Sequence, residues 1–286
     1  MVRRELLEGD ALLIGAGDIV RCDKDLPPAQ ATAKLIDRFP GATVFTLGDN
    51  VYQNGTKKEF DDCYDKAWGG SIKERTRPSP GNHDYGIYPP ASRFNADPYF
   101  NYFGAKAGSK GLGYYSYDVG QWHVISLNSM AGEKGAPKMA DQRTWLERDL
   151  AANPRKCTLA YWHHPLFSSG SEHGDQATDP GRKMGVLWKP LLDHGADVIL
   201  NGHDHHYERF DRQDANKMVT AAGIREFIVG TGGGDQRGLS TTKDNSQVSI
   251  PDIYGVLLLT LHPTSYEWHF IDTDGNVRDS GSEDCH

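Results

Sequence analysis

The sequence predicts an α/β fold, built as a layered sandwich of mixed sheets flanked by helices. Short apolar runs typical of strands recur along the chain, and segments with helical spacing lie between them. A chain of 286 residues can also bury one substantial core, and this one contains no repeat, low-complexity stretch or long linker. We therefore expect a single domain over residues 1–286.

Helices are expected where apolar residues recur every three or four positions between the strand-like runs. In one of these segments, Leu146 and Leu150 lie one turn apart and Asp141 is a candidate N-cap. The expected helices are Pro28–Arg38, Lys57–Trp68, Met139–Ala152 and Val186–His194.

Strands are expected at short apolar or alternating runs bounded by turn residues. Two pairs of runs read as hairpins, with turns at Gly120–Gln121 and Pro263–Thr264. Gly230–Gly234 follows another run and lacks the lysine of a phosphate-binding P-loop, so we interpret it as a tight turn near the cleft. The expected strands are Ala11–Ala16, Thr43–Leu47, Gly113–Val119, Trp122–Leu127, Thr158–Trp162, Asp197–Leu200, Glu226–Val229, Tyr254–Leu261 and Ser265–Ile271.

Seven side chains that can bind metal fall into five short clusters, each just past a strand-like run. Because ligands of open α/β sheets gather outside the carboxyl ends of the strands, one repeated sequence position becomes one shared crevice. Glycine precedes four of the clusters and permits a sharp, closely packed turn. The seven residues are Asp18, Asp49, Tyr52, Asn82, His163, His203 and His205.

These residue types suit a particular chemistry. Carboxylate, phenolate and imidazole donors favour iron, manganese or zinc, whereas the sequence has no clustered cysteines for a structural zinc site. Two ions about 3.5 to 4 Å apart can hold a hydroxide and clamp the oxygens of a phosphoryl group. One carboxylate must bridge them, and Asp49 lies in the middle of the set. The pattern predicts a two-metal site that hydrolyses phosphoesters.

Five motif blocks carry a family resemblance. In order they are GD (17–18), GDNVY (48–52), GNHD (81–84), YWHHP (161–165) and GHDH (202–205). This set resembles the calcineurin-like metallophosphoesterases and, within them, the purple acid phosphatases of the bacterial type. GDNVY marks the subfamily, because its tyrosinate ligand stands three residues after the bridging aspartate. Val20 occupies a position where the broader superfamily has histidine and purple acid phosphatases do not.

The resemblance implies a four-layer α/β/β/α sandwich and assigns the metals. Fe(III) would lie among Asp18, Tyr52 and His205, and a divalent zinc, manganese or iron ion among Asn82, His163 and His203, with Asp49 bridging both. A charge count agrees with this, since about four negative charges from two carboxylates, a phenolate and a hydroxide face about five positive ones. About one positive charge then remains for a phosphate anion.

Three further histidines are candidates for catalysis. His83 matches the histidine of GNHD that contacts substrate in the family, and His173 matches one that acts toward the leaving group. His164 is a weaker candidate, either for a phosphate contact or for a supporting role beside the metal ligands. The implied function is an acid phosphatase-like hydrolysis of phosphomonoesters, with the hydroxide attacking in line and a histidine protonating the leaving group. The alternatives are a phosphodiesterase acting on a nucleotide or lipid headgroup, and an inactive metal-binding recognition protein.

Two loops are candidates for the substrate rim. Tyr85–Lys110 shows no periodic pattern and is rich in aromatics; Tyr88, Phe94, Tyr99 and Tyr102 either line the rim or simply pack against the surface. Ser168–Gly185 carries His173 and is a candidate lid. For His206 we expect a surface role or a role beside the ligands, and for His123 a place in a strand.

Charge and hydropathy limit the partners. The net charge of −8 and the lack of a basic tract disfavour extended nucleic acid, and no apolar run approaches the ~20 residues of a membrane span, so a small phosphoester is the expected partner. Met1–Asp10 has no hydrophobic signal core, which indicates a cytosolic protein or an exported one whose signal was removed.

The cysteines bear on the compartment of the protein. Four cysteines allow three disulfide pairings. Cys285 at the end of a polar tail favours secretion or the periplasm.

Overall fold

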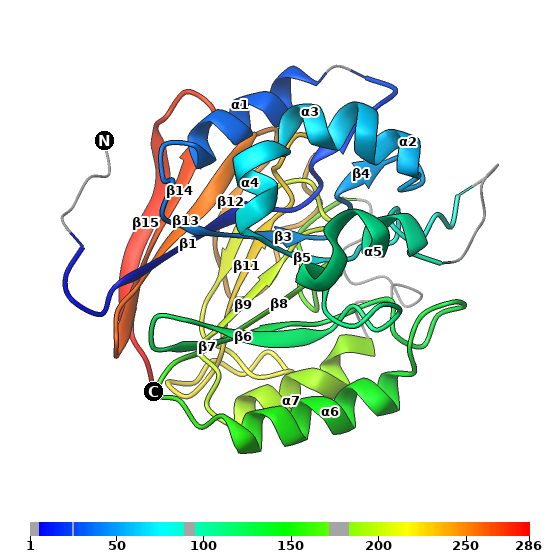
Figure 1. The fold of residues 1–286 in the computed structure, drawn as a ribbon. Coiled ribbons are helices and arrows are strands. Elements are labelled where there is room, and N and C mark those ends of the chain that lie inside the picture. Colours follow the sequence, from blue (N-terminus) through cyan, green and yellow to red (C-terminus); the bar gives the residue numbers. More distant parts are fainter. Residues whose placement is uncertain (1–5, 25, 89–94, 172–182) are drawn as a thin grey trace.

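The computed structural model describes residues 6–24, 26–88, 95–171 and 183–286. In this part of the chain, sheets pack face to face and helices cover their outer faces, which gives the layers α/β/β/α (Figure 1). The expected four-layer fold class is therefore confirmed.

The first sheet mixes parallel and antiparallel strands. Across it lie, in order, β15 (Val277–Asp284), β14 (Ser265–Asp272), β13 (Gly255–Leu261), β1 (Ala11–Ala16), β3 (Thr43–Leu47) and β5 (Thr76–Ser79). Strands β1, β3 and β5 are parallel, so their carboxyl ends lie at the same edge. This edge carries the first metal-capable side chains.

The second sheet is also mixed. Across it lie β12 (Ser246–Ile250), β10 (Tyr207–Phe210), β11 (Arg225–Val229), β9 (Val198–Asn201), β8 (Thr158–Trp162), β7 (Trp122–Ser126) and β6 (Tyr115–Val119). Strands β7, β8, β9 and β11 are parallel. A small parallel pair, β2 (Val20–Arg21) with β4 (Val51–Tyr52), lies beyond the ends of β1 and β3.

The helices form the outer layers. On the side of the first sheet lie α1 (Pro27–Ile36), α2 (Lys57–Glu59), the π-helical turn η1 (Phe60–Tyr64), α3 (Asp65–Ala67), α4 (Gly70–Arg75), α5 (Asp97–Phe103) and the 3₁₀ turn η2 (Gly104–Ala107). On the side of the second sheet lie α6 (Met139–Ala152) and α7 (Gly185–Asp193) (Figure 1).

Strand β8 shows how the core separates the layers. Leu159 and Tyr161 point into the core between the sheets, and Ala160 and Trp162 point toward α6 and α7. Successive side chains of a strand face opposite sides, so a strand between two apolar layers is apolar throughout. The run TLAYW is therefore typical of a buried central strand. His163 follows directly after it.

The expected elements are largely confirmed, and the segment Tyr85–Lys110 is corrected. We expected it to have no regular structure, but its described part contains α5 and η2. Pro98 stands in the first turn of α5, where its missing N–H costs nothing. Tyr99 is fully buried and Tyr102 packs on Phe60, so these two tyrosines belong to an aromatic cluster rather than to a rim. Phe94 lies outside the described residues.

Residues 277–284, which were not among the expected strands, form the edge strand β15 along β14. The sequence left three cysteine pairings open, and the structure pairs Cys22 with Cys63 and Cys157 with Cys285. Cys285 is buried directly after β15, and Cys157 directly precedes β8, so the second disulfide joins the two sheets.

Among the residues that the structure describes, no helix is both long and apolar enough to cross a membrane.

Candidate metal centre

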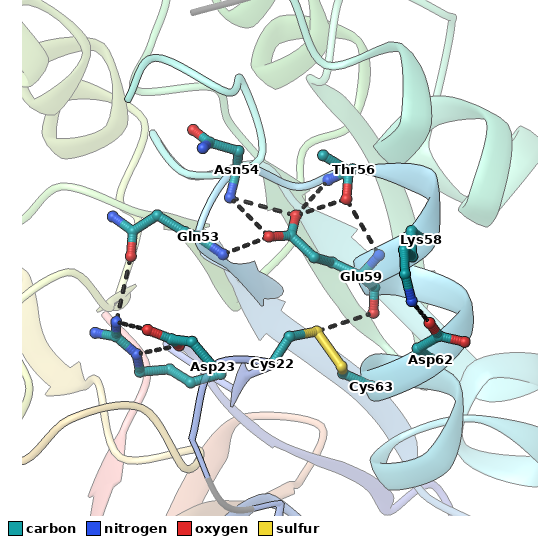
Figure 2. The surroundings of a disulfide bond; sticks show 10 residues. Cys22, Asp23, Gln53, Asn54, Thr56, Lys58, Glu59, Asp62 and Cys63 are labelled. Carbon is teal, nitrogen blue, oxygen red and sulfur yellow. Dashed lines mark hydrogen bonds and ion pairs between the residues drawn. A yellow bond between two sulfur atoms is a disulfide. The ribbon is translucent and has the colours of Figure 1, made fainter. Parts of the chain in front are cut away.

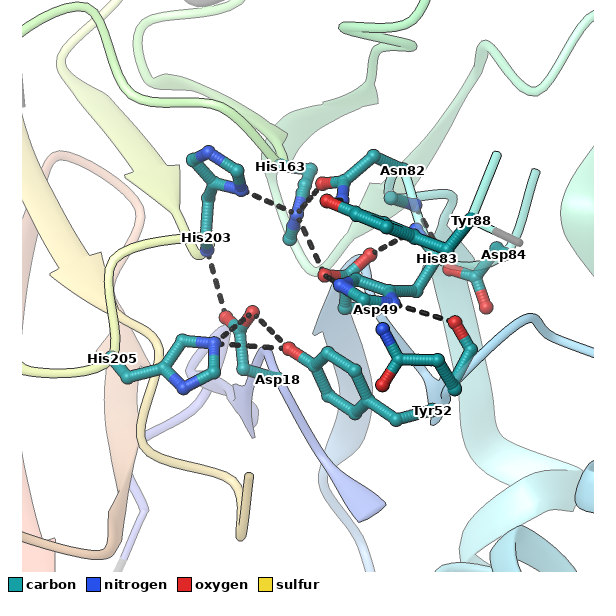
Figure 3. Close-up of polar contacts among 12 residues, drawn as sticks. Asp18, Asp49, Tyr52, Asn82, His83, Asp84, Tyr88, His163, His203 and His205 are labelled. Carbon is teal, nitrogen blue, oxygen red and sulfur yellow. Dashed lines mark hydrogen bonds and ion pairs between the residues drawn. The ribbon is translucent and has the colours of Figure 1, made fainter. Parts of the chain in front are cut away.

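The structure gathers the seven predicted side chains into one buried cluster at the carboxyl ends of the strands (Figure 3). Those from the first sheet follow β1, β3 and β5, and those from the second follow β8 and β9. Because the two sheets lie face to face, these ends meet across the core. The buried members are Asp18, Asp49, Tyr52, Asn82, His163, His203 and His205.

One half of the cluster consists of Asp18, Tyr52 and His205. The Tyr52 hydroxyl donates to Asp18 Oδ1 at 2.8 Å. His205 Nε2 lies 3.0 Å from the same hydroxyl and 3.2 Å from Asp18 Oδ1. A carboxylate oxygen, a phenol oxygen and an imidazole nitrogen therefore lie close to one another.

The other half consists of Asn82, His163 and His203, with Asp49 beside them. His163 Nε2 lies 3.0 Å from Asn82 Oδ1, 3.1 Å from His203 Nδ1 and 3.3 Å from Asp49 Oδ2. Ligand atoms of Asp18, Asp49 and His163 also lie within 4.8 Å of one another. Asp49 is thus close to both halves.

The backbone turns sharply where the strands end. Asp18, Asp49 and His203 have positive φ angles of 59°, 46° and 71°, in the left-handed region that L-residues rarely adopt. The sequence assigned the turns to the preceding glycines. At Gly81 and Gly202, however, the requirement is space, since a Cβ would lie 2.2 Å from Asp49 Oδ1 and 2.6 Å from Asp18 Oδ2 respectively.

Two imidazole rings of the cluster are oriented by hydrogen bonds to backbone carbonyl groups. His163 Nδ1 lies 2.6 Å from the carbonyl oxygen of Leu47, and His205 Nδ1 contacts the carbonyl oxygen of Asp235. A carbonyl only accepts, so each Nδ1 carries a hydrogen and each ring turns Nε2 toward the cluster, where a neutral ring would offer its lone pair to a cation.

The electrostatics of the cluster favour a bound cation. Burial opposes the charged form of His163, but the Asp49 carboxylate outweighs it and raises the pKa of His163 to about 9. Burial together with the charges of Asp18 and Asp49 raises the pKa of the Tyr52 phenol well above its usual value. The cluster therefore stabilises positive charge. It does not stabilise the phenolate form of Tyr52 unless a strong Lewis acid lies beside that side chain. The donor set and its charge fit metal ions.

Of the three histidines predicted to take part in catalysis, two lie beside the cluster and one lies outside the described residues. The His83 ring lies between the Tyr52 and Tyr88 rings, with Nε2 3.8 Å from Asp49 Oδ2. The His164 ring lies 4.1 Å from that of His203. His173 lies outside the described residues, as does most of the candidate lid.

Of the histidines set aside in the sequence, His206 is buried and its Nε2 lies 3.0 Å from Glu208, beside the ligands rather than on the surface. His123 lies in β7 as expected.

The sequence did not indicate the residues that support the side chains of the cluster. Asp84 is buried and its Oδ2 accepts from the backbone N–H of Gly81 at 2.8 Å and from Asn50 Nδ2 at 2.9 Å. It thereby joins the loops that carry Asn82 and Asp49. Its place as the last residue of GNHD was the available signal. Asp235 and Ser129, which contact His205 and His164, had no local signal because they are distant in sequence.

A turn after Tyr52 is organised by Glu59 (Figure 2). The Glu59 carboxylate accepts from the backbone N–H of Gln53 and of Thr56, both at 2.7 Å, and forms a capping box with Thr56 at the start of α2. The Gln53 carbonyl in turn contacts His83 Nδ1 at 2.6 Å. The disulfide of Cys22 lies beside this turn, with Sγ 3.6 Å from the Glu59 carbonyl oxygen.

The chain is similar in sequence and in structure to parts of known proteins. Purple acid phosphatase 15 of Arabidopsis thaliana is 30% identical over 221 residues, which cover 68% of this chain and 40% of that protein. The chain thus spans about two fifths of the length of that relative. Similar solved structures include purple acid phosphatase PPD1 from yellow lupin seeds, with a TM-score of 0.76, 19% identity and coverage of 96% of this chain and 54% of that chain. Another is GAP50, the anchor in the inner membrane complex of Plasmodium, with a TM-score of 0.72, 15% identity and coverage of 97% and 89%.

The model of the calcineurin-like phosphoesterase family matches residues 4–207, a range that contains all seven residues of the cluster. The motif blocks, the fold and this match agree, and the chain belongs to the calcineurin-like phosphoesterase family, within which it is similar to the purple acid phosphatases.

Proposed function

We propose that this chain is a dinuclear metal-dependent hydrolase of phosphomonoesters, of the acid phosphatase type. The observation that carries the proposal is the buried cluster itself, in which carboxylate, phenol, amide and imidazole donors converge from both sheets. Burying such groups without a cation is unfavourable, and a structural role does not require donors of this kind to face one another.

Each half of the cluster would hold one ion. Asp18, Tyr52 and His205 suit Fe(III), because a phenolate needs a strong Lewis acid. Asn82, His163 and His203 suit a divalent zinc, manganese or iron ion, and Asp49 would bridge. When bound, two such ions supply Lewis-acid activation of water and of the phosphoryl group.

His164 is proposed as a hydrogen-bond donor to the phosphate rather than as a third histidine ligand. The Ser129 hydroxyl accepts from the His164 backbone N–H at 3.2 Å, so its own hydrogen is available to His164 Nδ1 at 2.7 Å. The neutral ring then carries its hydrogen on Nε2. This is the reverse of His163, whose Nδ1 donates to a carbonyl.

His83 and His173 complete the proposed machinery. The His83 ring is held beside Asp49 by the Gln53 carbonyl and lies close enough to the cluster to contact a bound phosphate. His173 is proposed as the proton donor to the leaving alkoxide, from its place in the motif pattern alone. A positioned acid of this kind contributes about 10²- to 10⁴-fold to the rate.

The test compares matched aryl phosphate monoester and diester substrates on metal-loaded protein across pH. We expect a higher kcat/KM for the monoester, with an acidic optimum. Asp49→Asn should lose turnover and metal retention together, and Tyr52→Phe should lose any visible phenolate-to-iron absorption. Tyr102→Phe is the matched control, because its hydroxyl contacts Asp65 outside the cluster. Near-normal activity of Asp49→Asn would refute the bridging role.

A phosphodiesterase and an inactive binding protein are the alternatives. Preference for the diester would indicate the former without changing the ligand assignments. The fold alone does not exclude the latter, because GAP50, described as an anchor, shares it. The complete set of donors, with His83 beside Asn82, favours an enzyme. Stoichiometric metal with no hydrolysis of either ester would instead support the recognition protein.

The location and partners are part of the proposal. We propose a single catalytic domain that acts on small phosphoesters in an exported compartment, because disulfides persist where the environment is oxidising. A net charge of −8 disfavours extended nucleic acid. Four free thiols in protein purified without reductant would contradict the location.

A further inference from the structure

We infer that Tyr88 is a positioning residue for the metal centre, because its hydroxyl fixes the amide of Asn82 and its ring fixes the imidazole of His83. The inference rests on the proposed function, since both of these residues belong to the proposed machinery. Tyr88 lies in the segment after GNHD, and Figure 3 shows it over the cluster beside Asn82 and His83.

The hydroxyl of Tyr88 gives the outer end of the Asn82 amide a hydrogen-bond partner when Oδ1 faces the cluster. Asn82 Nδ2 donates to Tyr88 Oη at 3.1 Å, and Asn82 Oδ1 then lies 3.0 Å from His163 Nε2. The two ends of an amide have nearly the same shape but opposite hydrogen-bonding roles. Turned by 180°, Asn82 would present N–H groups where a ligand oxygen is needed. The Tyr88 hydroxyl can accept from Nδ2 or donate to Oδ1, so it holds the outer end of the amide in place while a cation at the inner end selects Oδ1.

The surroundings make this contact hard to replace. Asn82 is only 4% exposed, so water has little access to the amide N–H if the Tyr88 hydroxyl is removed. A buried donor without an acceptor costs about 1–3 kcal/mol. Without the hydroxyl, the metal-binding orientation of the amide therefore carries the cost of an unsatisfied N–H group, which weakens metal binding.

The ring of Tyr88 acts on a second target. It stacks on the His83 ring with centroids 4.3 Å apart and planes inclined by 16°. On the other side the Tyr52 ring lies at the same centroid distance, inclined by 57°. His83 is thus held between two aromatic rings while its Nδ1 contacts the Gln53 carbonyl at 2.6 Å. Removing the Tyr88 ring would leave one face of the imidazole uncovered.

Tyr88 is itself anchored to the turn that carries these groups. Its backbone N–H donates to Asn54 Oδ1 at 3.2 Å, and the Asn54 backbone N–H lies within hydrogen-bond distance of the Glu59 carboxylate. Asn54 is 5% exposed. The turn at 53–56 therefore supports Tyr88 and His83 together.

The experiment separates the two contacts with two variants. Tyr88→Phe keeps the ring and removes the hydroxyl, whereas Tyr88→Ala removes both. Tyr102→Phe is the matched control, from the same segment but bonded to Asp65. Each protein is loaded with Fe(III) and titrated with Zn²⁺ against a chromogenic chelator, and thermal melts confirm folding.

We expect Tyr88→Phe to weaken Zn²⁺ binding about 10- to 100-fold, as loss of a supporting contact to a metal ligand does. Its visible iron band should be unchanged, because Tyr52 is untouched. Saturating Zn²⁺ should restore its kcat. Tyr88→Ala should keep a lower kcat even at saturating Zn²⁺, because His83 is no longer held.

Wild-type Zn²⁺ affinity in Tyr88→Phe would overturn the role of the hydroxyl and leave the proposed function standing. Full kcat of Tyr88→Ala at saturating Zn²⁺ would overturn the role of the ring. A wild-type protein that binds neither ion, or binds both without hydrolysing any phosphoester, would instead overturn the proposed function and this inference with it. Equal loss of Zn²⁺ affinity in Tyr102→Phe would show a general loosening of the segment and refute the specific contact.

Discussion

Removal of the Cys157–Cys285 disulfide is expected to destabilise the protein more than removal of Cys22–Cys63. The perturbation is a pair of double variants, Cys157→Ala with Cys285→Ala and Cys22→Ala with Cys63→Ala. Each deletes one disulfide without leaving a lone thiol. The first disulfide joins the end of β15 to the start of β8, and the second joins the turn after β2 to η1.

The magnitudes follow from the length of chain that each bond closes. A disulfide stabilises mainly by restricting the unfolded chain, and the effect grows with the logarithm of the enclosed length. The sequence separations are 128 residues for Cys157–Cys285 and 41 for Cys22–Cys63. The free energies of unfolding should therefore fall by about 5 and about 4 kcal/mol respectively. Either loss is large against a typical total of about 5–15 kcal/mol.

The assay is urea unfolding at equilibrium, without reductant, with the slope of each transition checked for changes in the unfolded state. A smaller loss for Cys157–Cys285 than for Cys22–Cys63, at equal slopes, would refute the loop-closure reasoning for this chain. Metal binding is an independent control. Cys157 lies at the opposite end of β8 from His163, so the variant at that bond should keep wild-type metal stoichiometry while it remains folded.

Two further predictions concern a buried ion pair and a glycine. Burial lowers the pKa of His123, but its contacts with Asp149 and Asp118 outweigh burial, so the pKa in the folded protein is raised. The ion pair therefore stabilises the folded protein fully below about pH 6.5, the usual pKa of histidine. This stabilisation is lost as the pH rises through the raised pKa of the folded state. Urea unfolding, measured from below to well above about pH 6.5, should show a difference in the free energy of unfolding between wild type and His123→Gln that narrows toward high pH; a constant difference would contradict the assignment. Gly81→Ala would place a Cβ 2.2 Å from Asp49 Oδ1, whereas Gly41→Ala meets nothing within 4 Å. Equilibrium dialysis should therefore find metal lost only from Gly81→Ala, and equal retention by both would show that Asp49 can shift without cost.

The sequence was sufficient to predict the cluster because a parallel strand and the residue after it form a local signal. Asp18, Asp49 and His163 each follow an apolar run, and the parallel strands β1, β3, β8 and β9 bring their ends together. No local pattern in the sequence predicts that the two sheets pack face to face. That expectation came from the family resemblance. The structure then supplied the distances.

The missed elements have identifiable physical causes. Strand β15 (VRDSGSED) is half exposed and pairs along one side with β14, so its residues lack the apolar character expected of a strand. Helix α5 (DPYFNYF) is stabilised by burying Tyr99, Phe100 and Phe103 in an aromatic cluster with η1, which is a tertiary effect. The contacts of Ser129 and Tyr88 likewise depend on packing between segments.

The left-handed backbone at Asp18, Asp49 and His203 has a consequence for how this site can be lost in evolution. Each such residue costs of the order of 1–3 kcal/mol, and glycine at the same position removes that cost. At His203, a descendant chain released from selection for catalysis could therefore gain stability by the same substitution that destroys the cluster. At Asp18 and Asp49 the gain is offset, because their carboxylates accept from the backbone N–H groups of His203 and His83 at 2.8 and 2.9 Å. Folding alone would thus favour decay of the site most at His203.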